Sequence, residues 1–386
     1  MLVSDLLAKS ERPLIHVGNG IRDCIPEFLS FVEKHQIPFV TARNANDIVE
    51  SDHPLYVGRP GTFAQRGANF AVQTCDLYIA IGTRLTLTQT GYNTKDYARN
   101  AVIVQVDVDK AELDKGTLRD PIKIQSDAGE FIASLDFMGA DFGDWKRRCL
   151  DWRTRYPVCL PQYQSENGFV NSYVLLDTLS NLATPEDVIV TDMGFAFQVT
   201  HQTWKVKKGQ RLLTNCGLAP MGWGLPAAIG ASFATGRRVI CITGEGGLMM
   251  NVQELATVMH HKLNIKIFVL NNGGYATIKQ TQELGFEGRL MGVNKDTGLS
   301  FPDLGSVANA HGIYTISTKW NESMAGTVAL ALNQEGPVFC QLFISPDQPQ
   351  APRALNRRNP DGTMNPTKLE DAHPFLSPEV LAEEMK

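Results

Sequence analysis

Long hydrophobic runs and an excess of basic residues are both missing from this sequence. Its longest apolar stretches, such as residues 265–270, have the length of a strand and fall short of the roughly 18 residues that a membrane-spanning helix needs. The 36 Lys and Arg residues are outnumbered by 41 Asp and Glu residues, which gives a formal net charge of −5. We therefore expect no nucleic-acid partner and no membrane partner.

Targeting and catalytic signatures of several large protein classes are also missing. Residues 1–5 lack the basic and apolar regions of a secretory signal, which favours a cytoplasmic protein. The sequence has no Walker A lysine motif, no Gly-x-Ser-x-Gly and no His-Glu-x-x-His. P-loop, α/β-hydrolase and zinc-protease chemistry are therefore without support.

Cysteine pairs with the spacing of redox or zinc sites do not occur. The seven cysteines are scattered along the chain, and Cys75, Cys241 and Cys340 stand in apolar runs typical of strands. We expect reduced thiols in the protein core.

Alternating strand and helix patterns fill two long blocks of the 386 residues. This alternation predicts an α/β fold with two doubly wound, Rossmann-like parallel sheets. In the first block we expect strands at 14–17, 37–41, 76–81 and 102–106. In the second we expect strands at 188–191, 239–243, 265–270 and 338–344. The predicted organisation is a first domain at 1–140, a linker at 141–170, a second domain at 171–346 and a C-terminal tail at 347–386.

A glycine-rich turn in the second block indicates an anion site. One strand pattern ends at Gly244, and Glu245, Gly246 and Gly247 follow it. The two later glycines allow the backbone to approach a diphosphate closely. A helix expected to open near Asn251 would point its N–H groups toward the same anion.

A second strand end predicts a metal ligand beside this turn. The strand pattern after the turn ends in Asn271-Asn272. Since parallel strands bring their carboxyl ends to one edge of a sheet, we expect Glu245 and Asn272 to share a cation. Oxygen ligands bridged to phosphates are typical of Mg²⁺.

The two strand ends together resemble the thiamine diphosphate (ThDP) binding motif, in which Gly-Asp-Gly is followed at a fixed interval by Asn-Asn. Glu245 and Asn272 are 27 positions apart (272 − 245), which is the family's spacing. The alternative is that both turns belong to some other Rossmann-like protein. Further matching segments make that alternative weaker.

Residues 215–231 resemble a second family segment that ends in Gly-Leu-Pro-Ala-Ala-Ile-Gly-Ala. By this resemblance Met221 is the side chain that bends the cofactor between its two rings. The Ala219 carbonyl and the Met221 N–H would meet the aminopyrimidine. The turn at 191–197 takes the place of a diphosphate-contacting turn. The cofactor-binding residues implied are Gly194, Phe195, Ala196, Ala219, Met221, Gly244, Glu245, Gly246, Gly247, Asn272, Gly274 and Tyr275. The metal ligands implied are Glu245, Asn272 and Gly274.

The closest resemblance is to the acetolactate synthase-like group of ThDP enzymes, and it covers about residues 12–376. It implies a central domain at 1–140 and a ThDP diphosphate-binding domain at 171–346. Residues 271–282, together with tail segments 356–362 and 368–376, are similar to members linked to nucleotide-sugar modification. Some members hold FAD in the central domain and others hold nothing. The Gly18-Asn19-Gly20 turn lacks the third glycine of a dinucleotide fingerprint, because Asp23 stands there, and this weighs against FAD.

Three departures from the family shape the functional hypotheses. Glu245 replaces the usual Asp, and its extra methylene moves the carboxylate outward by about 1.5 Å. The turn Gly194-Phe195-Ala196 lacks the Gln-His donors of many members. The pyrimidine-binding domain, which carries the glutamate that activates the cofactor, has no counterpart here. Even in full-length members that glutamate comes from a second subunit.

The leading hypothesis is the large subunit of a split ThDP- and Mg²⁺-dependent carboligase. It would decarboxylate pyruvate or a similar 2-keto acid and transfer the acyl unit to an acceptor carbonyl. A separate pyrimidine-binding-domain subunit would complete it, in a homodimer of this chain or a heterotetramer. The alternatives are a non-catalytic ThDP-binding or scaffold relative and a simple 2-keto acid decarboxylase.

Overall fold

The chain divides into two compact units in a computed structural model that describes residues 2–138, 141–165, 168–355, 357–358, 361–365 and 368–386. Unit 1 is Met1–Val158 with Ala351–Lys386, and unit 2 is Cys159–Gln350. The tail motif expected at 356–362 lies partly outside the described residues. None of the helices in the described part of the chain has the length and hydrophobicity to span a bilayer.

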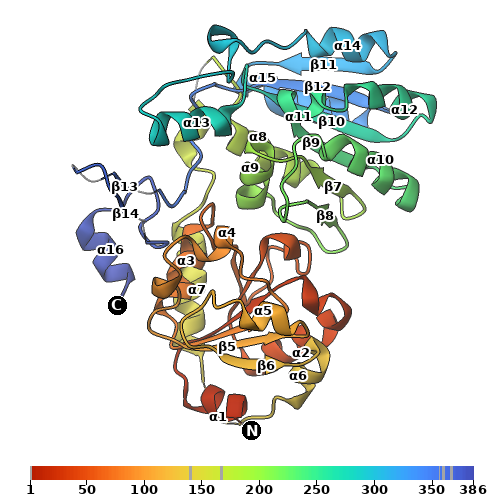
Figure 1. Cartoon of the computed structure of the whole chain (residues 1–386). Helices are drawn as coiled ribbons and strands as arrows, with labels where there is room; N and C mark the ends of the chain where they lie inside the picture. The colour runs from red at the N-terminus through yellow and green to blue at the C-terminus, as the bar shows by residue number, and fades with distance from the viewer. Residues whose placement is uncertain (1, 139–140, 166–167, 356, 359–360, 366–367) are drawn as a thin grey trace. The chain divides into compact units, whose positions relative to one another are not determined.

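Unit 1 is built on a six-stranded parallel sheet of order β3-β2-β1-β4-β5-β6. Figure 1 labels β5 and β6 of this sheet. Its strands are β1 Pro13–Val17, β2 Phe39–Thr41, β3 Tyr56–Gly58, β4 Leu77–Ile81, β5 Val102–Asp107 and β6 Ile122–Gln125. Its helices are α1 Leu2–Lys9, α2 Ile25–His35, α3 Arg66–Thr74, α4 Leu87–Thr90, α5 Lys110–Asp114, α6 Ala128–Ser134, α7 Gly143–Arg155 and α16 Pro378–Glu384. A two-stranded hairpin pairs β13 Arg357–Arg358 with β14 Met364–Asn365.

Strands β1 to β4 of unit 1 are buried along their whole length, as the continuous apolar runs of the inner strands predict, whereas the edge strand β6 is partly exposed. Ile15 and Ile79 point to one face and pack in a core with α2 and α6. Leu14 and Tyr78 point to the other face and pack with α3 and α7. Helices on both faces of a parallel sheet make this a doubly wound unit, which confirms the predicted fold class.

Unit 2 repeats the architecture with strand order β11-β12-β10-β9-β7-β8 (Figure 1). Its strands are β7 Val188–Thr191, β8 Arg211–Leu213, β9 Val239–Gly244, β10 Ile265–Asn271, β11 Tyr314–Thr318 and β12 Val338–Phe343. Its helices are α8 Ser172–Leu182, α9 Phe195–Thr203, α10 Gly224–Thr235, α11 Glu245–Met249, α12 Leu255–His260, α13 Ala276–Gly285, α14 Leu304–Ala310 and α15 Asn321–Asn333. The core under α10, α11, α12 and α14 holds side chains of four neighbouring strands, which fixes the edge where those strands end.

The segment expected as a linker is partly helical and belongs largely to unit 1. Its α7 buries Trp145, Cys149 and Trp152 in the core of that unit. Residues 351–386 also belong to unit 1, where Trp152 donates a hydrogen bond to Glu384 of α16. The bounds found by packing therefore lie near 158 and 350.

All seven cysteines are free thiols, as expected. Cys24, Cys75, Cys149, Cys241 and Cys340 are buried, whereas Cys159 and Cys216 are partly exposed. Among the described residues no group of three or more His, Cys, Asp or Glu side chains is arranged to hold a metal ion.

Candidate functional site

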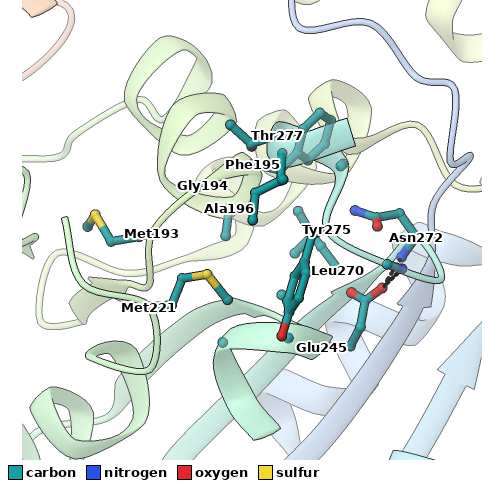
Figure 2. A pocket seen from close by; sticks show the side chains of 16 residues that line it. Met193, Gly194, Phe195, Ala196, Met221, Glu245, Leu270, Asn272, Tyr275 and Thr277 are labelled. Carbon is teal, nitrogen blue, oxygen red and sulfur yellow. Dashed lines mark hydrogen bonds between the residues drawn. The ribbon is translucent and has the colours of Figure 1, made fainter. Parts of the chain in front are cut away.

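A pocket with about 500 Å³ of open space lies at the carboxyl edge of the unit 2 sheet (Figure 2). Every predicted site residue lines it except Ala219, which is exposed at a left-handed turn with φ 52°. The lining residues that the sequence did not single out are Met193, Leu270, Ala276, Thr277 and Ile278. The segments that the motifs predicted to converge therefore do meet in space.

The pocket forms here because β9 and β10 are neighbours. Gly244 and Leu270 are paired in the parallel ladder, so the residues after both strands emerge at the same edge. The helix after β9 begins at Glu245 and not near Asn251, which corrects the sequence expectation. Glu245 and Gly246 thus belong to the first turn of α11, where backbone N–H groups lack partners within the helix.

Glu245 is the charged centre of this edge. Its side chain is 1% exposed, and its Oε1 accepts the N–H groups of Asn272 at 3.0 Å and Gly274 at 2.8 Å (Figure 2). Burial raises the pKa of Glu245 to about 7, although hydrogen bonds from backbone N–H groups partly oppose that rise. No salt bridge to Glu245 is found among the described residues.

The turn after β10 is shaped to surround that carboxylate. Gly273 has φ 78°, a conformation that favours glycine. A Cβ on Gly274 would lie 2.0 Å from the Val293 carbonyl oxygen, so only glycine fits there. Together, Glu245, Asn272 and Gly274 present a carboxylate, a side-chain amide and a main-chain carbonyl. These are hard oxygen donors of the kind that Mg²⁺ prefers, and the residues fit such an ion.

The glycines of the turn have a packing role beside the predicted one. A Cβ on Gly246 would lie 2.1 Å from the ring of Tyr275. This ring lies over the turn (Figure 2). It also makes an edge-on contact with Phe301, at 5.8 Å between ring centroids. Glycine at 246 therefore leaves room for an aromatic wall of the pocket as well as for a ligand.

The opposite wall comes from two other segments. Gly194, with φ 69°, is the N-cap of α9, and Phe195 and Ala196 form the first turn of that helix. Met221 extends toward the pocket from the turn before α10 (Figure 2). An apolar pocket wall with backbone N–H groups at a helix start suits a ligand that has both rings and an anionic group.

Comparisons with known proteins agree with this pocket. Residues 192–342 match the family model "Thiamine pyrophosphate enzyme, C-terminal TPP binding domain", and residues 2–135 match "Thiamine pyrophosphate enzyme, central domain". Thiamine pyrophosphate is another name for ThDP. The chain belongs to this family of enzymes, with an acetolactate synthase-like central and C-terminal part, as the sequence motifs predicted.

Similar curated proteins include the acetolactate synthase isozyme 2 large subunit of Escherichia coli (strain K12). It is 31% identical over 348 residues, covering 88% of this chain and 61% of the relative. The isozyme 1 large subunit of the same organism is 28% identical over 347 residues, with 89% and 60% covered. The acetolactate synthase large subunit of Pyropia yezoensis is 30% identical over 359 residues, with 89% and 59% covered. The chain thus spans about three fifths of the length of these relatives.

Proposed function

We propose that this chain is the cofactor-anchoring part of a ThDP- and Mg²⁺-dependent 2-keto acid carboligase of the acetolactate synthase type. The observation that carries the proposal is the pocket itself, where the Glu245 turn, the Asn272 turn and Met221 meet in a domain of the ThDP-binding family. In this proposal residues 1–140 are the central domain and residues 171–346 the diphosphate-binding domain. The 2-keto acid would be pyruvate or a close analogue.

Each wall of the pocket has a role in this proposal. The Glu245 carboxylate, the Asn272 amide and the Gly274 carbonyl hold the cation. The backbone N–H groups of the Gly246-Gly247 turn and of Gly194-Phe195-Ala196 bind the diphosphate, and Tyr275 covers it. Met221 would support the bent shape of the cofactor, and Ala219, which is exposed and does not line the pocket, would contact its pyrimidine from outside the described lining. When bound, ThDP supplies the carbon chemistry of decarboxylation and acyl transfer.

In this proposal the activating glutamate comes from outside the described pocket. Glu245 is the one glutamate among the described residues that lines the pocket, and its carboxylate would hold the cation. We propose that a pyrimidine-binding domain on another polypeptide chain supplies the activating glutamate, in a complex that contains at least two copies of this chain. The apolar wall of the pocket would then be closed from water by that partner.

A non-catalytic ThDP-binding role is the second candidate. It is favoured by the carboxyl of Glu245, which is longer than the usual aspartate and already bonded to the Asn272 turn. Such a protein would bind the cofactor weakly and release no CO₂. A simple decarboxylase is the third candidate, and it differs from a carboligase only in its products.

Calorimetric titration with ThDP and Mg²⁺ tests the proposal, with the chain alone and with a candidate pyrimidine-domain protein. We expect weak binding alone, tight binding in the complex, and CO₂ release from a 2-keto acid only in the complex. Binding without CO₂ release from any 2-keto acid would favour the non-catalytic role. Absence of binding under all conditions, including in Glu245→Asp, would refute the cofactor site.

A further inference from the structure

A buried aspartate of the 191–197 turn, which was not among the predicted cofactor-binding residues, joins the three segments that form the pocket. Asp192 follows β7, is 1% exposed and does not line the pocket. Its Oδ1 accepts the N–H groups of Met193 at 2.7 Å and Gly222 at 3.1 Å, and its Oδ2 accepts the hydroxyl of Thr243 at 3.0 Å. Each donor is next to a different pocket wall: Met193 precedes Gly194, Gly222 follows Met221, and Thr243 precedes the Gly244-Glu245 turn.

The packing around Asp192 is as specific as its hydrogen bonds. A Cβ on Gly247 would lie 2.6 Å from Asp192 Oδ2, and a Cβ on Gly224 would lie 2.8 Å from Asp192 Cβ. The carboxylate therefore fills the space behind the glycine turn, on the side away from the pocket. A side chain at position 224 or 247 would therefore clash with Asp192, so the aspartate requires glycine at both positions.

The other end of the same strand shows what a buried aspartate held for stability looks like. Asp187, just before β7, is also 1% exposed, and the Arg238 guanidinium contacts both of its carboxylate oxygens at 2.7 Å. No cationic side chain among the described residues is paired with Asp192 in this way. Burial raises the pKa of Asp192, and its hydrogen bonds only partly oppose that rise. A buried carboxyl without a cation is costly, and such costs are typical of functional sites.

We propose that Asp192 is a positioning residue of the cofactor site, which holds Met221 and the Gly246-Gly247 turn at the separation that ThDP requires. This inference rests on the proposed function, since it assigns those walls to the two halves of one ligand. Asp192 acts through the Gly222 N–H, the Thr243 hydroxyl and the Gly247 backbone, and never touches the ligand. Residues that hydrogen-bond to the ligand-contacting groups keep those groups within the small range of positions that binding requires.

The test compares full-length Asp192→Ala with Asp192→Asn and with Asp187→Asn as the matched control. The affinity for ThDP with Mg²⁺ is measured by calorimetry in the mixture in which the wild type binds. We expect Asp192→Ala to weaken binding at least tenfold. Asp192→Asn should retain most of the affinity, because an amide oxygen still accepts the Met193 and Gly222 N–H groups. Asp187→Asn should lower the midpoint of thermal unfolding but keep the affinity within about twofold.

Two results would overturn the inference while leaving the proposed function intact. One is an Asp192→Ala protein that binds ThDP as the wild type does. The other is an equal loss of affinity in Asp187→Asn, which would mean that Asp192 matters only through stability. Should Asp192→Ala fail to fold, Thr243→Val removes a single hydrogen bond from the same carboxylate. It should weaken binding several-fold, and unchanged binding would count against the inference.

Hydrogen exchange decides the case if the wild type binds no ThDP, a result that would refute the proposed function. In Asp192→Ala the amides of 193–196, 221–224 and 244–248 should exchange faster than in the wild type, while the rest of unit 2 stays protected. Asp187→Asn should instead loosen the opposite end of β7. Unchanged exchange in the three segments would overturn the positioning role without reference to any ligand.

Discussion

A buried glutamate in unit 1 and a buried glutamate in unit 2 are held in opposite ways. Glu384 accepts hydrogen bonds from Arg155 at 2.6 Å, Trp152 at 2.6 Å and Tyr156 at 2.7 Å. Burial alone would raise the pKa of Glu384, but these donors, Arg155 foremost, lower it to about 2. Among the described residues Glu245 accepts hydrogen bonds from backbone N–H groups alone, and its burial raises its pKa to about 7.

This difference separates a structural carboxylate from one that is available to a ligand. The charge of Glu384 is neutralised by Arg155 of the same chain. The Glu384 carboxylate therefore joins α16 to α7 and is not available to a ligand. The charge of Glu245 has no cationic partner among the described side chains. A divalent cation would neutralise the charge of Glu245 and favour the ionised form of this carboxyl. The two carboxyls therefore predict opposite results of the same substitution.

Glu245→Gln is the substitution with the largest expected effect. The amide keeps an oxygen for the Asn272 and Gly274 N–H groups but loses the charge that would hold Mg²⁺. We expect the affinity for ThDP with Mg²⁺ to fall at least 100-fold, which is about 2.7 kcal/mol, while the free energy of unfolding is unchanged or slightly higher. Calorimetry and urea unfolding measure the two quantities. Glu384→Gln is the control, and equal loss of affinity in both variants would end the comparison.

Gly246→Ala tests whether the close contact between Gly246 and the Tyr275 ring keeps the pocket of unit 2 open. The new Cβ would meet the Tyr275 ring at 2.1 Å, so the ring must move into the pocket. We expect ThDP affinity to fall at least tenfold and stability to fall by about 1–3 kcal/mol. Adding Tyr275→Ala should restore most of that stability. If the glycine substitution costs the same with and without the ring, the contact does not control the pocket.

The sequence predicted most of both sheets and most of the pocket lining, and its failures have physical causes. The strands that were not predicted are β3, β6, β8 and β11. β3 and β8 have three residues each, and β6 and β11 lie at sheet edges with partly exposed side chains, so neither length nor hydrophobic pattern marks them. The central strands were found because they are buried on both faces and read as continuous apolar runs.

The sequence could not predict the roles of residues whose contacts lie far away along the chain. Asp192 is one more acidic residue at a strand end until Gly222 and Thr243 are seen to donate to it. Tyr275 was expected to contact the cofactor, but its packing on Gly246 depends on a contact across 29 positions (275 − 246). The partners of Glu384 lie more than 200 positions earlier in the chain. Motif spacing carries no information about such contacts.

Glu384→Gln should have the reverse outcome of Glu245→Gln. Loss of a charge that accepts hydrogen bonds from three side chains is expected to lower the free energy of unfolding of unit 1 by about 2 kcal/mol. ThDP affinity should stay unchanged. Urea unfolding followed by tryptophan fluorescence measures the change, since Trp145 and Trp152 lie in this unit and contribute to the signal. Glu383→Gln is a suitable control, because Glu383 is on the same helix and exposed. A result equal to that control would mean that Glu384 contributes no stability.

The smallest expected effect is the pH dependence of the stability difference between the wild type and Glu384→Gln. The native pKa of Glu384, about 2, lies below the ordinary value of 4.5, so its ionised form stabilises the fold above pH 4.5. This contribution is lost as the pH falls from 4.5 toward 2, because the carboxylate is then protonated in the native state as well. The stability difference between wild type and Glu384→Gln should therefore be constant from pH 7 to about 5 and reduced by roughly half near pH 3. A difference that stays constant down to pH 3 would mean that packing, and not the charge of Glu384, joins α16 to α7.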